Sequence, residues 1–311
     1  MSAIDPDMTT DLSILRISPE VQSALAANQP VVALESTVIA HGLPRPQNFQ
    51  TALRLEQIVR DSGGTPATIA ILSGNLCVGL NQDQLRQIAE SDDIRKVSAR
   101  DLAVAVARGW NGATTVATSM WIAHRAGINV FATGGIGGVH RGSLPDVSAD
   151  LPELARTPMV VVCSGAKIVL DLPATREWLE THGVTVLGYE CDELPAFYSR
   201  SSGLSVDARV DSAAEVASLV RAQRTLDTQT ALLVTVPIPA AVEVEPVALQ
   251  TFLDEALGKA ERSGVSGREL TPFLLSRMAQ QSGGATLQAN IGLLENNVRV
   301  AADIARALRP H

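Results

Sequence analysis

Short apolar runs alternate with amphipathic helical segments along most of this chain, and that alternation limits the folds open to it. The runs 31–39, 66–72 and 159–163 predict buried strands, whereas segments such as 47–61 and 213–224 predict helices. Strands that alternate with helices favour a largely parallel sheet with helices over its faces. The sequence therefore predicts an α/β fold, a single-domain α/β/α sandwich with a largely parallel central sheet. A closed (β/α)₈ barrel shows the same alternation and is the alternative.

No linker, internal repeat or low-complexity segment divides the 311 residues. Ser18 followed by Pro19 is typical of a helix start, because serine caps the first amides and proline suits the first helical position. We therefore expect a flexible N-terminal tail over residues 1–15 and one domain over residues 16–311.

Composition excludes several classes of protein. A net charge of −8 argues against a general nucleic-acid binder. Three widely spaced cysteines without a CxxC pair suggest neither a disulfide framework nor a zinc site. The first twenty residues lack the apolar core of a signal peptide, and no apolar run reaches membrane-spanning length. We expect a cytoplasmic protein with no membrane partner.

A glycine-rich loop separates two of the predicted strands. The apolar run 128–132 meets four glycines at 134, 135, 137 and 138, and His140 and Arg141 follow. Such a loop lets backbone approach a ligand and can turn amide groups toward an anion. It lacks both the GK[ST] ending of a P-loop and the GxGxxG spacing. A tight connection between strands is the simpler interpretation, and the nearby charged residues favour a site.

Lysine is rare enough here to need a reason. Only Lys96, Lys167 and Lys259 are present, against a total of 25 lysines and arginines. Lysine, unlike arginine, becomes a nucleophilic amine when its surroundings lower its pKa from about 10.4. Lys259 fits a solvated helix face, whereas Lys167 follows an apolar strand and a Ser-Gly-Ala turn. A surface charge is the ordinary role for each lysine, and its context favours a functional role for Lys167.

Carboxylates occupy two unusual places. Glu35 lies within the apolar run 31–39, where desolvation would raise its pKa and make it a proton donor near neutral pH. A carboxylate at a strand end that pairs with an arginine is the equal alternative. Asp146 and Asp150 could hold a hard divalent cation, or could cap a helix and face solvent. His41 and His140 could bind metal, orient substrate or simply form hydrogen bonds.

These residues together describe an enzyme that acts on a phosphate-bearing carbonyl or sugar through a lysine Schiff base, with an acid and a possible metal. The same motifs resemble those of the pseudouridine-5′-phosphate glycosidases, a family that includes the indigoidine synthase A-like proteins. The resemblance covers about residues 17–308. Its motifs are ALESTVIAHGLPRPQN at 33–48, KVSARDL at 96–102, NGATTVA at 111–117, FATGGIGGVHRG at 131–142, SADL at 148–151, CSGAK at 163–167, LPAFY at 194–198 and TPFLL at 271–275.

The resemblance implies reversible cleavage of the C–C glycosidic bond of pseudouridine 5′-phosphate, the reaction of a pseudouridylate synthase, to uracil and ribose 5-phosphate. It implies a small-molecule nucleotide substrate, a homotrimer and Mn²⁺ as the metal. By motif, Lys167 is the Schiff-base nucleophile, Glu35 is the proton donor and Asp146 is the metal ligand. The substrate-binding residues it implies are Lys96, Val116, Ser148, Ala149 and Asp150, with His140 and Asn290 as further pocket candidates.

Two departures from the family pattern stand out. Only Ser143-Leu144-Pro145 separates Gly142 from Asp146, a shorter loop than the family pattern predicts, which bears on the metal site. Val236 stands before Pro-Ile-Pro where the family usually has asparagine.

Two other functions fit the residues. A class I aldolase-like enzyme on another sugar phosphate would share the lysine but would need neither Glu35 nor a uracil pocket. A metal-dependent sugar-phosphate binding protein would need no reactive lysine.

Overall fold

The computed structural model describes residues 13–141, 146–265, 267 and 270–309. Its strands follow the predicted alternation with helices. The strands are β1 (Leu15–Ile17), β2 (Val31–Leu34), β3 (Thr65–Leu72), β4 (Asn75–Val78), β5 (Arg95–Val97), β6 (Gly112–Thr114), β7 (Val130–Ala132), β8 (Val139–His140), β9 (Val160–Cys163), β10 (Leu170–Asp171), β11 (Thr185–Tyr189), β12 (Ala208–Val210) and β13 (Leu232–Thr235).

The helices fill the intervals between the strands. The α-helices are α1 (Pro19–Ala26), α2 (Gln47–Asp61), α3 (Gln82–Glu90), α4 (Leu102–Ala107), α5 (Val116–Arg125), α6 (Asp150–Leu154), α7 (Leu172–Thr181), α8 (Ala213–Leu226), α9 (Pro246–Arg262), α10 (Leu270–Gln281) and α11 (Ala285–Ala307). Short turns of other helix types include η1 (Val38–Gly42), η2 (Ala99–Asp101) and η3 (Ala240–Val242).

One large sheet runs through the molecule in the order β1-β4-β3-β2-β7-β9-β13-β11-β12, with β6 paired to β3 and β5 to β6. From β3 through β2, β7, β9 and β13 to β12 every pairing is parallel. The chain leaves β2 toward β3 and later returns to place β7 on the other side of β2. This reversal of strand order makes the β2–β7 boundary a topological switch point. In open α/β sheets, ligands bind beside such a point, at the carboxyl ends of the strands.

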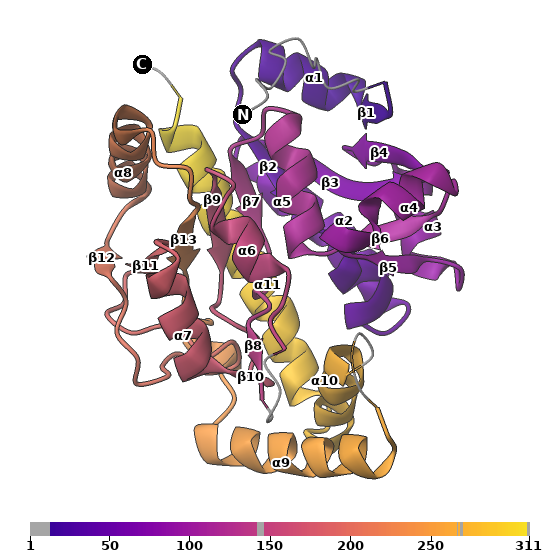
Figure 1. The fold of residues 1–311 in the computed structure, drawn as a ribbon, viewed down its shortest axis with the longest axis vertical. Helices are drawn as coiled ribbons and strands as arrows, with labels where there is room; N and C mark the ends of the chain where they lie inside the picture. Colours follow the sequence, from indigo (N-terminus) through magenta and orange to yellow (C-terminus); the bar gives the residue numbers. More distant parts are fainter. Residues whose placement is uncertain (1–12, 142–145, 266, 268–269, 310–311) are drawn as a thin grey trace, which may run out of the picture.

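Helices cover both faces of the sheet. Helices α2, α8 and α11 pack together along one face, with α11 against β2, β7 and β9. Helices α5, α6 and α7 lie over the other face (Figure 1). The α/β/α sandwich is confirmed, and the barrel alternative is wrong because the sheet stays open, with β1 and β12 at its two ends.

Helices α9 and α10 form a hairpin beyond one end of the sheet (Figure 1), and α10 also packs against η1. This end is where β2, β7 and β9 finish. The hairpin therefore closes over the carboxyl ends of the central strands rather than over a face.

One local prediction needs correction, and one element of the sheet was not predicted. The run 31–39 is not one strand, since β2 ends at Leu34. The Ser36 hydroxyl donates to the Ile69 carbonyl at 2.6 Å and accepts from the Thr114 amide at 2.9 Å. The Ser36 side chain therefore takes the place of the backbone hydrogen bonds that would continue the strand. The antiparallel β3–β4 hairpin was not predicted. Its turn, Ser73-Gly74, has φ values of 48° and 76°, as expected of a two-residue hairpin loop.

The helix start at Ser18 and the absence of disulfides among the cysteines agree with expectation. The predicted tail lies mostly outside the described residues, although Leu15 already belongs to β1. Ser18 caps α1 through the Val21 amide at 3.3 Å. The cysteines are free. Among the described residues, no helix has the length and apolar character needed to cross a bilayer.

Candidate active site

A cavity of about 380 Å³ opens at the carboxyl ends of the central strands, beside the β2–β7 switch point. Every residue that the sequence assigned to the site lines this cavity, although the residues come from distant parts of the chain. They are Glu35, Lys96, Val116, His140, Asp146, Ser148, Ala149, Asp150, Lys167 and Asn290.

Glu35 follows β2 directly and is only 7 % exposed. Its carboxylate accepts a hydrogen bond from the Thr133 hydroxyl. Burial raises the pKa of Glu35, while the Lys167 ammonium and the Thr133 hydrogen bond oppose that rise. The alternative of an arginine partner for Glu35 is not found among the described residues, where Thr133 donates to the carboxylate and Lys167, Asp150 and Lys96 are the charged groups that act on it. A carboxyl in this setting suits a proton donor.

Lys167 lies at the end of a tight turn after β9. Gly165 in this turn has φ of 83°, and a Cβ there would stand 2.1 Å from the Pro195 carbonyl oxygen. Only glycine therefore fits. The Lys167 amide donates to the Ile136 carbonyl at 3.1 Å, and the Ile136 amide donates to the Gly165 carbonyl at 3.1 Å. These bonds extend the β7–β9 pairing past the strands and hold the half-buried Lys167 beside the glycine loop.

The glycine loop serves close packing more than anion binding. The Gly137 amide donates to Asp150 at 2.8 Å and the Ile136 amide to Gly165, so both are taken by the protein. A Cβ at Gly137 would meet the Ser148 hydroxyl at 2.1 Å, and one at Gly135 would meet the Phe197 ring at 2.7 Å. The prediction that the amides of this loop face an anion is therefore wrong for the amides of Ile136 and Gly137. Arg141 turns its Nε to the Leu170 carbonyl at 3.2 Å.

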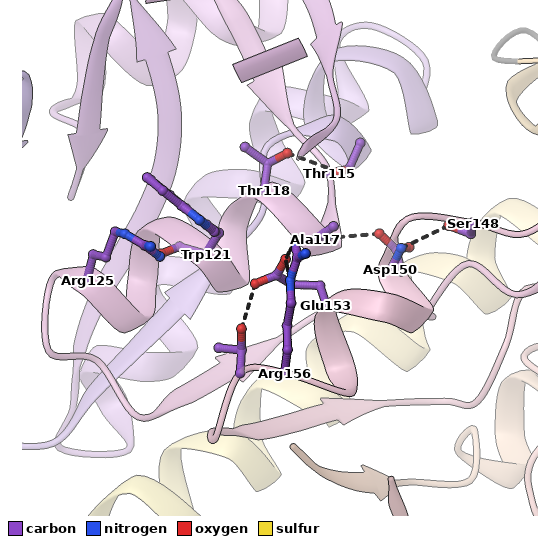
Figure 2. Close-up of polar contacts among 10 residues, drawn as sticks. Thr115, Ala117, Thr118, Trp121, Arg125, Ser148, Asp150, Glu153 and Arg156 are labelled. Atoms are coloured by element: carbon purple, nitrogen blue, oxygen red, sulfur yellow. Dashed lines mark hydrogen bonds and ion pairs between the residues drawn. The ribbon is translucent and has the colours of Figure 1, made fainter. Parts of the chain in front are cut away.

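Asp150 joins two segments that line the cavity. One carboxylate oxygen accepts from the Ala117 amide in the first turn of α5 at 2.9 Å (Figure 2). The other carboxylate oxygen accepts from the Gly137 amide. Its own amide donates to the Ser148 hydroxyl at 3.3 Å. The capping alternative is therefore partly right, since Asp150 caps α5 although it begins α6. A negative charge at the N-terminus of α5 is favourable.

The wall around Asp150 carries most of the predicted substrate contacts. Ser148 and Ala149 lead into α6, and Val116 is the first residue of α5. Lys96 projects from β5, which pairs with β6 just before α5, and it lies close enough to Glu35 to lower the pKa of that carboxyl. Strand pairing and the α5–α6 contact thus bring three sequence-distant segments to one side of the cavity.

Another wall of the cavity comes from η1, α10 and α11. His41 and Val38 come from η1, and Thr271, Pro272 and Leu275 come from α10. Asn290 of α11, 5 % exposed, adds an amide to this wall. This wall combines the apolar side chains of Val38, Pro272 and Leu275 with the polar side chains of His41, Thr271 and Asn290.

The side chains available as ligands limit the kind of metal site that this cavity could form. In the parts of the chain that the structure describes, no group of three or more His, Cys, Asp or Glu side chains is arranged to hold an ion. Asp146 is exposed at the cavity wall, and its carbonyl accepts from the His140 amide at 2.8 Å. These residues do not fit an all-protein cage. They fit a hydrated divalent cation held by one carboxylate and by substrate oxygens.

Comparison with known proteins agrees with this geometry. Residues 20–307 match the family model for indigoidine synthase A-like proteins. The pseudouridine-5′-phosphate glycosidase of Geobacillus kaustophilus is 51% identical over 296 residues, which are 94% of this chain and 98% of that protein. The enzyme of the same name from Hahella chejuensis is 50% identical over 294 residues, 94% of this chain and 97% of its own.

The chain belongs to the family of pseudouridine-5′-phosphate glycosidases and indigoidine synthase A-like proteins. The resemblance seen in the sequence motifs is confirmed.

Solved structures of the family share the fold. The prealnumycin C-glycosynthase AlnA in complex with ribulose 5-phosphate superposes with a TM-score of 0.87 at 40% identity, covering 94% of this chain and 96% of that one. An indigoidine synthase A-like protein from Thermotoga maritima also gives 0.87, at 36% identity, with 95% and 97% covered.

Three residues that support the site were not predicted. Thr133 donates to Glu35, Phe197 packs on Gly135, and Asn297 binds the loops behind the cavity. Phe197 has φ of 62°, a left-handed conformation rare for an aromatic residue, and its amide donates to the Ser164 carbonyl at 3.0 Å. A signal existed for Asn297, which falls on the apolar face of α11 with Leu293 and Leu294.

The two departures from the family pattern have different outcomes. The short segment 143–145 lies outside the described residues. Val236 follows β13 and is 3 % exposed, and its amide donates to the Cys163 carbonyl at 2.8 Å. Valine therefore fills an apolar position beside β9 where the family usually has an amide.

Proposed function

We propose that this protein cleaves and forms the C–C glycosidic bond of pseudouridine 5′-phosphate, with uracil and ribose 5-phosphate as the products of cleavage. The observation that carries the proposal is a buried acid, Glu35, electrostatically coupled to Lys167 across one cavity, in a chain about half identical to enzymes of that name. The ribulose 5-phosphate held by the related C-glycosynthase supports a sugar-phosphate substrate.

Ring opening is the first step in this proposal. An ordinary glycosidase protonates a leaving heteroatom between two carboxylates, but here the leaving atom is carbon. The unprotonated amine of Lys167 attacks C1′ as the bond from C1′ to the ring oxygen breaks, and Glu35 donates its proton to that oxygen. The new ammonium then returns a proton to the Glu35 carboxylate, so the acid is restored.

Bond cleavage follows from the amine at C1′. Glu35 first donates its proton to C5 of uracil, which makes C5 tetrahedral and leaves the positive charge shared by C6 and N1. The Lys167 nitrogen lone pair then forms a C1′=N double bond, while the electron pair of the C1′–C5 bond restores the C5=C6 double bond of the departing uracil. Water then adds to the iminium and releases ribose 5-phosphate, so one water is consumed for each substrate cleaved. The same amine serves as nucleophile and as electron source.

The 5′-phosphate requires positive charge and hydrogen-bond donors. Lys96 and the Ser148 hydroxyl line the cavity on the side of the α5 N-terminus, and they supply both. Asp146, with water and phosphate oxygens, would hold a Mn²⁺ ion, which would supply further positive charge to the phosphate. His140 lies beside Asp146 and would orient that end of the substrate.

A direct test supplies uracil and ribose 5-phosphate and examines the mixture by mass spectrometry for a C-nucleotide. Borohydride should trap ribose 5-phosphate on Lys167, located by peptide mapping. No C-nucleotide, together with condensation of ribose 5-phosphate with another carbonyl compound, would favour the aldolase-like alternative. Absence of any trapped adduct would exclude the lysine chemistry.

The assembly and location proposed for the protein rest on the family resemblance. We propose a homotrimer that works in the cytoplasm. Light scattering on the purified protein measures its mass against the 32.8 kDa chain. A mass near that of one or two chains would remove the trimer from the proposal.

A further inference from the structure

Asn297 of α11 is fully buried and uses its whole amide on two loops of the site. Its Nδ2 donates to the Thr133 carbonyl at 2.9 Å and to the Gly134 carbonyl at 3.3 Å. Its Oδ1 accepts from the Ser164 hydroxyl at 3.1 Å. Asn297 does not itself line the cavity. Its contacts are therefore with the backbone and side chain that carry the reactive groups, not with the substrate.

Those contacts lead directly to both reactive side chains. Thr133 holds the Glu35 carboxylate through its hydroxyl. Ser164 begins the turn that ends in Lys167, and its amide donates to the Gly134 carbonyl at 2.9 Å. The same Gly134 carbonyl thus accepts from Ser164 and from Asn297. A single amide connects the loop behind the acid with the loop behind the nucleophile.

Helix α11 carries both Asn297 and Asn290, which lines the cavity. Asn290 lies seven residues earlier on the same helix, so it lies about two turns, or roughly 10 Å, along the axis on nearly the same side. Asn290 reaches the cavity, and Asn297 holds the loops that form the cavity floor. Because both asparagines belong to one helix, α11 fixes the position of the Asn290 amide relative to Glu35 and Lys167.

We propose that Asn297 is a positioning residue that holds Glu35 and Lys167 in their reactive relation by tying the Thr133–Gly134 and Ser164 segments to α11. The inference rests on the lysine chemistry proposed above. An amide is required because it donates to two carbonyls and accepts from a hydroxyl at once. Alanine leaves the Thr133 carbonyl and the Ser164 hydroxyl without this partner in a dry interior, while the Gly134 carbonyl keeps only the Ser164 amide.

The test compares Asn297→Ala with Thr235→Val. Thr235 is also fully buried, and its hydroxyl donates to the Leu187 carbonyl at 2.8 Å, outside the cavity. Both variants should melt at a lower temperature than the parent. Below those melting temperatures, Asn297→Ala should lower kcat at least about 30-fold with less than a threefold change in KM for ribose 5-phosphate. Thr235→Val should keep kcat within about twofold.

Two further readouts separate positioning from simple loss of stability. The rate of borohydride-trapped adduct formation should fall with kcat in Asn297→Ala. Its pH profile should also lose activity at higher pH than the parent, because a loosened Thr133 no longer lowers the pKa of Glu35 and the acid stays protonated longer. Ser164→Ala removes only the donor to Oδ1 and should show the same changes in smaller size.

The outcomes are distinct. Asn297→Ala with kcat within threefold of the parent overturns the inference, whatever its melting temperature. If Asn297→Ala does not fold, Ser164→Ala with parental kcat and an unmoved pH profile overturns it. If the parent protein itself traps no ribose 5-phosphate, it is the proposed lysine chemistry that fails.

Discussion

Two glutamates in this molecule share nearly the same local chemistry and differ in what they face. Glu35, at the end of β2, accepts a hydrogen bond from Thr133, and Glu56 of α2 accepts one from Thr68 at 2.6 Å. Burial raises the pKa of each carboxyl, and each threonine opposes that rise. Glu56 packs against β3 near Arg60, which pairs with Glu20. Glu35 opens into the cavity beside Lys167.

The comparison teaches that a raised carboxyl pKa does not by itself make a proton donor for catalysis. Desolvation acts on both groups, because each leaves water on folding. Only Glu35 has a nucleophile and space for a substrate within reach. Glu56 is therefore a matched internal control for Glu35, and the predictions below use it.

The largest effect is expected at Lys167, the nucleophile that lies beside Glu35 and has no counterpart beside Glu56. Lys167→Ala should lower turnover of pseudouridine 5′-phosphate by at least about 10⁴-fold, because it removes the amine that bonds to C1′. The fold should remain, as judged by circular dichroism and melting temperature. Lys259→Ala, on an exposed position of α9, should keep parental turnover. Near-normal turnover in Lys167→Ala would disprove the proposed chemistry.

The next effect separates the two glutamates directly. Glu35→Gln should lower kcat by about 10² to 10⁴-fold, since the amide keeps the size and a hydrogen bond to Thr133 but cannot donate a proton to the ring oxygen. Glu56→Gln should leave kcat within about twofold. Steady-state kinetics with both variants measures the contrast. Equal losses in the two would show that burial alone, not the cavity, explains their effect.

Metal removal should have a smaller effect. Asp146→Asn should lower activity by about tenfold or more, because the ion would lose the carboxylate that holds it. Chelation of the parent protein should have an effect of the same size, because it removes the ion itself. Added Mn²⁺ should restore the chelated parent and should restore Asp146→Asn poorly. Full activity in metal-free protein would remove the ion from the proposal and leave Lys96 as the main phosphate contact.

The smallest effect concerns the two threonines and the pH profile. Glu35 acts while protonated, so activity should fall as pH rises through its pKa. Thr133→Val removes a hydrogen bond that lowers this pKa, and the fall should move to higher pH. Thr68→Val removes the corresponding bond to Glu56 and should leave the profile unchanged. Rate measurements across the neutral range decide the matter, and a shift toward lower pH in Thr133→Val would contradict the assignment.

The glycine loop shows where inference from sequence stopped. Four glycines beside His140 and Arg141 suggested an anion-binding loop, yet the Gly137 amide serves Asp150 and the loop packs against Phe197 and Ser148. Phe197 is distant in sequence from the loop. Since the residue that requires a glycine can come from anywhere in the chain, local sequence shows that backbone passes close to something but not to what.

Sequence by itself determined the class of fold, the scarcity of lysine that marked Lys167, and the motifs that carry the family resemblance, because periodicity and residue type are local properties. Tertiary structure alone decided that Glu35 follows the end of a strand rather than lying within it, that Thr133 and not an arginine holds it, and that Asn297 ties its loop to that of Lys167. These depend on contacts between segments up to 164 residues apart, which only packing brings together.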